Sequence, residues 1–208
     1  MGAAFDAEKR HVPPEARFST RDLMLAALFA ALTAVGALFA IPFFGPIPFT
    51  LQVLFVLLAG LVLGTRLAAM SMVSYIVVGL VAPVYAGGAS GLGTLLGPAG
   101  GYIWGFVLGA ALVGCLAQRL ARPRLLSLSV VAAAGLIPIY GLGAAWLAIS
   151  LHTFSFQAIL WGGVLQFLPM DLFKAVLAAM AASALLSTQA QLPVAVARNH
   201  RLERRSTA

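Results

Sequence analysis

Two ionisable side chains stand three residues apart in an apolar stretch towards the end of the chain. The segment PMDLFKA, residues 169–175, carries Asp171 and Lys174. On a helix, side chains at this spacing share one face, with β-carbons roughly 5–6 Å apart. An ionisable group near the centre of a bilayer costs about 2.5–3.5 kcal/mol on insertion scales, so the pair needs a partner or a use. Together, a carboxylate and an ammonium can accept from and donate to a small polar ligand.

A structural role for the pair is the alternative. Pro169 suits the first turn of a helix, which places Asp171 where the helix dipole favours a carboxylate. Lys174 would then extend to the membrane interface and form an ordinary ion pair. Because a lysine at this end of a span runs against the charge bias of the rest of the chain, we favour the functional interpretation.

The composition is that of an integral membrane protein. Of the 208 residues, 62% are hydrophobic and 9% are charged, and the mean hydropathy is +1.00, whereas a soluble domain carries roughly 25% charged residues. Long apolar runs predict an all-α bundle of six transmembrane helices. The predicted spans are residues 22–42, 49–64, 67–83, 101–119, 127–150 and 169–188.

The basic residues alternate between the connections. Twelve of the 13 lysines and arginines lie before the first span, in the second-to-third and fourth-to-fifth connections, or after the last span. By the positive-inside bias these segments and both termini are cytoplasmic. We therefore predict a cytoplasmic segment 1–21, a membrane domain 22–188 and a basic cytoplasmic tail 189–208. The net charge of +7 follows from this topology and does not indicate nucleic-acid binding.

The connections at the other face are apolar and rich in glycine and proline. They cover residues 43–50, 84–102 and 151–168, and irregular backbone at membrane depth is tolerated only where protein or a cavity surrounds it. We expect them to fold inwards, the last one with a short interfacial or re-entrant helix. Gln52 and Tyr102 lie at the same face as the charged pair, and such a set of polar groups beneath apolar loops suits a small-molecule pocket.

The sequence lacks the residue patterns that other classes of function require. The three histidines are isolated from one another, so no metal site is expected, and the single Cys115 argues against disulfide or redox chemistry. No nucleophile with an adjacent base is visible, so we predict that the chain is not an enzyme. The glycine runs lack the lysine of a phosphate-binding loop, and the first 21 residues lack the apolar core of a cleavable signal peptide.

Small residues recur along the first span. Ala26, Ala30 and Ala34 stand at every fourth position, which forms a smooth strip that another helix can approach closely. Periodicity alone favours packing inside the same bundle. The alternative is docking to a separate membrane subunit.

Three segments together resemble the BioY family, the biotin-specific substrate-binding components of energy-coupling-factor (ECF) vitamin transporters. They are GPIPFTLQVLFVLLAGLVLG (45–64), VYAGGASGLGTLLGPAGGYIWGF (84–106) and FLPMDLFKAVLA (167–178). The resemblance covers residues 20–188 in order, with Met170 standing where many relatives are expected to have glycine.

The resemblance implies a six-helix protein whose vitamin site opens outwards beneath the first and third outer connections. It implies that Asp171, Lys174, Gln52 and Tyr102 bind biotin. It also makes the alanine strip a docking surface for a transmembrane coupling subunit driven by ATP-binding-cassette ATPases. No cofactor is implied, because biotin is the cargo and ATP is used only by the partners. Lys174 would meet either the ureido carbonyl or the carboxylate of biotin.

A second class of function is an autonomous secondary transporter in which Asp171 carries a proton and Lys174 modulates it. Such proteins often have internal repeats with broken helices in corresponding positions. The sequence has one embedded charged pair and no visible repeat, so the importer subunit is the favoured prediction.

Overall fold

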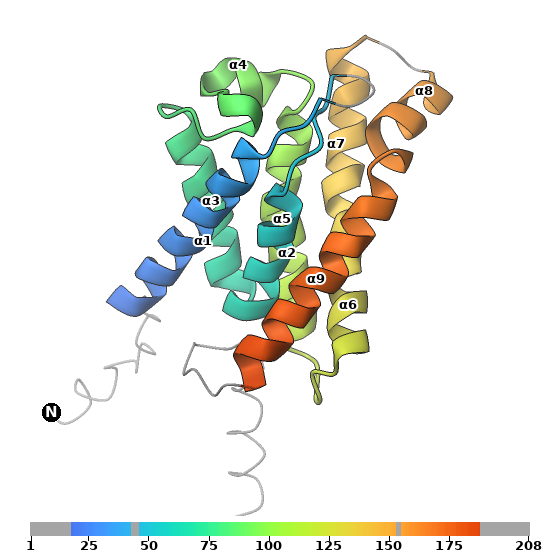
Figure 1. Ribbon diagram of the computed structural model, residues 1–208. Coiled ribbons are helices and arrows are strands. Elements are labelled where there is room, and N and C mark those ends of the chain that lie inside the picture. The colour runs from blue at the N-terminus through green and yellow to red at the C-terminus, as the bar shows by residue number, and fades with distance from the viewer. Residues whose placement is uncertain (1–17, 43–45, 153–154, 188–208) are drawn as a thin grey trace, which may run out of the picture.

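The computed structural model describes residues 18–42, 46–152 and 155–187, and these residues are almost entirely helical (Figure 1). In chain order the elements are α1 (Thr20–Leu38), α2 (Gln52–Leu63), α3 (Thr65–Gly79), the short η1 (Ala86–Gly88), α4 (Gly91–Leu96), α5 (Gly100–Ala117), α6 (Leu125–Ala134), α7 (Leu136–Ser150), α8 (Phe156–Leu160), the π-helical turn η2 (Trp161–Leu165) and α9 (Leu168–Ser187). Within the described residues there is no extended strand, only two isolated β-bridges. The predicted all-α class is confirmed.

Within the part of the chain that the structure describes, four helical segments are long and apolar enough to cross a membrane. They are α1, α5, the combined α6 and α7, and the combined α8, η2 and α9. The spans predicted at 49–64 and 67–83 are shorter in the structure, since α2 has 12 residues and α3 has 15. At 1.5 Å per residue, α2 is roughly 18 Å long, well below the ~30 Å of a hydrocarbon core. Ten of its residues are buried, so protein surrounds most of this helix.

Local sequence signals explain where several helices begin and break. Ser19 and Asp22 form a reciprocal capping box at the start of α1, which satisfies two backbone N–H groups that the first turn leaves unpaired. The combined α6 and α7 segment is interrupted at Gly135. Pro138 explains this break, because its ring removes a backbone donor and crowds the preceding turn.

Three glycines on α5 allow α7 to approach closely. Gly101, Gly105 and Gly109 recur at every fourth position and all face α7. A β-carbon on Gly105 would lie 2.8 Å from the Cα of Ile139, and one on Gly109 would lie 2.7 Å from its Cγ1. Close contact of this kind is how membrane helices associate. It fixes the position of α7 beside the cavity described below.

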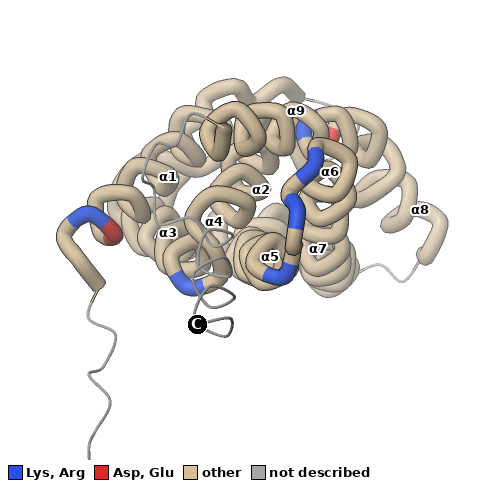
Figure 2. Tube along the Cα trace, turned by 90° about the horizontal axis from the view of Figure 1, so that it is seen from below, with Lys and Arg blue, Asp and Glu red and all other residues tan. Residues whose placement is uncertain are grey.

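The two ends of the bundle differ in charge. α4 and α8 lie at one end, whereas α1 begins and α9 ends at the other (Figure 1). All five described arginines belong to the latter end, at the start of α1, the start of α3 and the connection between α5 and α6 (Figure 2). The described part of the chain therefore has one strongly basic end.

The apolar connections at the opposite end behave in two ways. Ile47 in the first connection and Tyr85 and Leu95 in the second are buried, so parts of these two segments fold inwards as predicted. Other side chains of the second connection, Leu92 and Leu96, are 64% and 63% exposed. The third connection forms the expected short helix, α8. It is more exposed than predicted, since Phe156 and Trp161 are 77% and 67% exposed.

Candidate functional site

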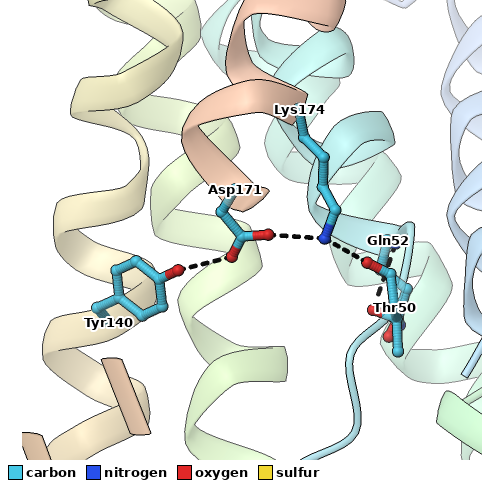
Figure 3. A network of polar contacts seen from close by, with 5 residues as sticks. All are labelled: Thr50, Gln52, Tyr140, Asp171 and Lys174. Atoms are coloured by element: carbon cyan, nitrogen blue, oxygen red, sulfur yellow. Dashed lines mark hydrogen bonds and ion pairs between the residues drawn. The ribbon is translucent and has the colours of Figure 1, made fainter. Parts of the chain in front are cut away.

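Asp171 and Lys174 lie in the first turns of α9, which begins one residue before Pro169. Their carboxylate and ammonium form an ion pair with 2.7 Å between Lys174 Nζ and Asp171 Oδ1 (Figure 3). Asp171 and Lys174 are only 4% and 3% exposed. The side chain of Lys174 is therefore enclosed by the bundle, which argues against snorkelling, whereas the ion pair that the structural alternative also predicted is present.

The pair belongs to a larger network that joins three parts of the chain (Figure 3). The hydroxyl of Tyr140, on α7, donates to Asp171 Oδ2 at 2.7 Å. Lys174 Nζ donates to the backbone carbonyl of Thr50 at 2.5 Å and lies 3.8 Å from the centroid of the Phe49 ring. Phe49 and Ile41 exchange two backbone hydrogen bonds. The chain before α2 is thus tied to the charged pair on α9.

A cavity of about 210 Å³ adjoins this network. Its volume is below the roughly 300–1,000 Å³ typical of sites for drug-sized ligands, so it suits a small molecule. The walls are mostly apolar, with a smaller number of polar and charged groups. The lining residues are Pro46, Ile47, Pro48, Phe49, Thr50, Gln52, Val53, Ala86, Thr94, Ala99, Tyr102, Ile103, Phe106, Ile139, Tyr140, Phe167, Asp171 and Lys174.

The loops over the cavity differ from those implied by the family resemblance. The first connection contributes Pro46 to Thr50, as expected. The second contributes Ala86, Thr94, Ala99 and Tyr102, whereas the third contributes only Phe167 among its described residues. The third connection instead forms α8, which lies to the side. The second connection therefore covers the cavity where the resemblance implied the third.

The structure brings all four predicted site residues to this one cavity. Gln52 Nε2 donates to the hydroxyl of Tyr75 at 2.5 Å, and the Tyr102 hydroxyl donates to the carbonyl of Gly163 at 2.8 Å. The sequence analysis missed Tyr140. The one available indication was that a single tyrosine stands in an otherwise apolar span. A buried phenol needs a hydrogen-bond partner, so this residue could have been expected near another polar group.

The hydrogen bonds already formed determine what the polar wall can still offer. The ammonium of Lys174 has three N–H groups, of which two have oxygen acceptors. Its remaining side faces Phe49, an attraction of roughly 0.5–2 kcal/mol that a ligand oxygen can replace. Each carboxylate oxygen of Asp171 accepts one bond and has a further lone pair. The wall thus offers one strong donor and several acceptors.

The predicted docking strip lies elsewhere, on α1. Ala26 and Ala30 are 3% and 8% exposed, and Ala34 is partly buried against the core. In this conformation the strip packs inside the bundle, as periodicity alone suggested. Docking of a partner through these three side chains stays a prediction, and it requires α1 to separate locally from its neighbours.

Comparisons with known proteins agree with this architecture. The sequence profile of the BioY family matches residues 9–191. The chain is 39% identical over 163 residues to "Biotin transporter BioY" of Thermotoga maritima, covering 78% of this chain and 94% of that one. It is 36% identical over 185 residues to "Biotin transporter BioY" of Rhizobium etli, covering 84% and 98%.

A solved structure has the same fold. It is described as a crystal structure of the S-component for biotin from an ECF-type ABC transporter. The TM-score is 0.75 at 25% identity, and the match covers 82% of this chain and 95% of the other. The profile match extends over most of this sequence, and the relatives are matched over nearly their whole length. This chain belongs to the BioY family.

Proposed function

We propose that this chain is the biotin-binding subunit of a vitamin importer. The observation that carries the proposal is the polar wall of the cavity, where Asp171, Lys174, Gln52 and Tyr140 converge beside apolar side chains. The ureido group of biotin has two N–H donors and one carbonyl acceptor. This matches a wall with one strong donor and several acceptors, and the names of the relatives point to the same ligand.

In the proposed complex the ureido ring lies against the polar wall. Lys174 donates to the ureido carbonyl, while Asp171 and Gln52 accept from the two N–H groups. Tyr102 borders the same cavity, and the thioether ring and valerate chain lie against its apolar side. Exclusion of water by these side chains strengthens each polar contact.

We further propose the topology and partners that the sequence predicted. The chain crosses the inner membrane six times, with α2 and α3 as two short crossings enclosed by the others. The basic end, segment 1–21 and tail 189–208 face the cytoplasm, and the cavity faces outwards. The chain carries no cofactor and performs no catalysis. A transmembrane coupling subunit and ATP-binding-cassette ATPases drive release, with the Ala26, Ala30 and Ala34 strip as the proposed contact.

Equilibrium binding of radiolabelled biotin to the purified chain in detergent tests this function. We expect saturable binding at nanomolar to low micromolar biotin, and its loss in Asp171→Asn and in Lys174→Met. Asp22→Asn is the matched control, because it makes the same change in the first turn of a helix at the opposite end of the bundle. It should bind as the unaltered chain does.

Absence of binding by a well-folded chain would overturn the proposal. The autonomous transporter is tested separately, by biotin uptake into proteoliposomes that contain this chain alone. Uptake that requires a proton gradient and not ATP would identify that alternative. Uptake only after the coupling subunits are added is the result expected of an importer subunit.

A further inference from the structure

A buried hydrogen bond connects the cavity to a tyrosine that does not line it. Gln52 begins α2 and borders the cavity, and its Nε2 lies 2.5 Å from the hydroxyl of Tyr75 on α3. Tyr75 is 1% exposed and is absent from the cavity wall. Gln52 is therefore the cavity residue through which the Tyr75 side chain can act directly on a ligand.

The hydroxyl of Tyr75 determines which end of the Gln52 amide faces it. A phenol has one proton, and Tyr75 donates this proton to the backbone carbonyl of Val84 at 3.1 Å. Towards Gln52 it has only a lone pair to offer. The amide nitrogen of Gln52 must then face Tyr75. If the amide were flipped, its oxygen would meet the lone pair of the Tyr75 hydroxyl, and two acceptors would be in contact.

The amide oxygen of Gln52 is consequently directed away from Tyr75. No described residue donates a hydrogen bond to Gln52 Oε1, whereas Gln52 Nε2 donates to Tyr75. Because Gln52 is 4% exposed and borders the cavity, the cavity is where this oxygen is reached.

We infer that Tyr75 is a positioning residue that fixes Gln52 as a hydrogen-bond acceptor for an N–H group of the ligand. The inference rests on the proposed function and deepens it, since it assigns the chemical class that this part of the wall selects. A ligand with an N–H donor at this point is accepted. A ligand with only an acceptor there is rejected, because Gln52 cannot rotate without breaking its bond to Tyr75.

A neighbouring tyrosine provides a matched control. Tyr85 is also fully buried, and its hydroxyl donates to the carbonyl of Ile76 at 2.7 Å. The rings of Tyr75 and Tyr85 pack edge to face with centroids 5.6 Å apart. Both hydroxyls thus tie α3 to the segment around residues 84–85, but only the hydroxyl of Tyr75 contacts Gln52. Tyr85→Phe removes the same kind of tether without changing the orientation of Gln52.

A double-mutant cycle on biotin affinity tests the inference. Tyr75→Phe should weaken binding roughly 5- to 20-fold, the range for loss of one oriented hydrogen bond. In a Gln52→Leu background, the same change should weaken binding by less than about 2-fold, because the group that Tyr75 orients is gone. Tyr85→Phe should change affinity by less than about 2-fold in both backgrounds. Additive effects of Tyr75→Phe and Gln52→Leu, or equal losses for the two tyrosine variants, would overturn the positioning role.

A second measurement needs no ligand. In the 15N-glutamine-labelled chain, the side-chain amide of Gln52 should give a slowly exchanging NMR signal, identified by its loss in Gln52→Leu, or in Gln52→Met if the leucine variant does not fold. Tyr75→Phe should shift this signal and accelerate its exchange, whereas Tyr85→Phe should leave it unchanged. A chain that shows this pattern but does not bind biotin contradicts the proposed function alone. A chain that binds biotin but keeps the signal in Tyr75→Phe contradicts the positioning role alone.

Discussion

At the scale of single residues, variants of the buried ion pair can show how much each charge contributes to stability and how much to ligand binding. Asp171 and Lys174 are both almost fully buried and are joined to Tyr140 and to the Thr50 carbonyl. Removing one partner leaves the other charge buried and uncompensated, which typically costs roughly 3–5 kcal/mol. Removing both leaves no charge.

The pair therefore predicts opposite results for single and double variants. Lys174→Met should lower the thermal midpoint of the purified chain clearly, and Asp171→Asn should lower it to a lesser degree, since asparagine can still accept the bond from Tyr140. The combined variant should recover much of the midpoint lost in Lys174→Met and still fail to bind biotin. Thermal unfolding and radiolabelled binding on the same samples check this. Recovery of binding in the double variant would assign the pair a purely structural role.

The identity of the ligand atom at Lys174 can be examined with an analogue. In 2-iminobiotin the ureido carbonyl is replaced by a group that is protonated at neutral pH and has only donors. Opposite the Lys174 ammonium, this replaces a charge-assisted hydrogen bond with repulsion. We expect affinity to fall by roughly 100-fold or more relative to biotin.

Lys174→Met is the informative background for this comparison. Having lost binding in the nanomolar to low micromolar range, it should bind both ligands only at much higher concentrations. The difference between their affinities should fall to less than about 10-fold, because the repelling charge is gone. Competition against labelled biotin measures both affinities. A discrimination that persists at full size in Lys174→Met would show that the ureido carbonyl lies elsewhere in the cavity.

At the scale of elements, the glycine face of α5 controls the site at a distance. Gly105 contacts the backbone of Ile139, the residue before Tyr140. A methyl group at Gly105 would press against this backbone, and overpacking of this kind typically costs 1–3 kcal/mol. Displacing α7 would also lengthen the bond from Tyr140 to Asp171.

We therefore expect Gly105→Ala to lower both the thermal midpoint and the affinity for biotin, the latter by roughly 10-fold, as for the loss of one hydrogen bond to a charged group. Gly141→Ala is the control. It changes α7 one residue beyond Tyr140, at a position where an added β-carbon meets nothing within 4 Å. Thermal unfolding and binding measure both effects, and equal losses in the two variants would contradict the role assigned to the α5–α7 contact.

The elements also show how far the sequence alone could predict the structure. Hydropathy located a helix at each predicted span, and the isolated charges of Asp171 and Lys174 indicated the polar wall before any geometry was known. The lengths of α2 and α3 were overestimated, because apolar composition does not distinguish contact with lipid from contact with protein. Tyr140 and Tyr75 were missed for a different reason. Their partners Asp171 and Gln52 are 31 and 23 residues away, and no local pattern reveals such contacts.

At the scale of the whole molecule, the basic end and the cavity end differ in charge. The described arginines lie at one end, whereas the loops that line the cavity lie at the other. A bias of this size orients membrane proteins with the basic side in the cytoplasm. The proposed topology consequently requires a ligand to reach the cavity from outside and to leave on the basic side.

Single cysteines at the two ends test this orientation directly. In a Cys115→Ala background, Ser90→Cys beside α4 should react in intact cells with a maleimide that cannot cross the membrane. Ala121→Cys, in the connection between α5 and α6, should react only after the cells are opened. Both positions are exposed, so access to the reagent rather than burial decides the result.

The same set of cysteines links orientation to the cavity. Thr94 lies on α4 with its side chain at the cavity wall, one turn from Ser90, whose carbonyl accepts the Thr94 hydroxyl at 3.1 Å. Thr94→Cys should therefore be labelled from outside, and saturating biotin should slow its reaction several-fold because the ligand fills the adjoining space. Ser90 does not line the cavity, so Ser90→Cys should react at the same rate with and without biotin. Labelling of Thr94→Cys only in opened cells would invert the proposed topology, whereas equal rates with and without biotin would place the ligand outside this cavity.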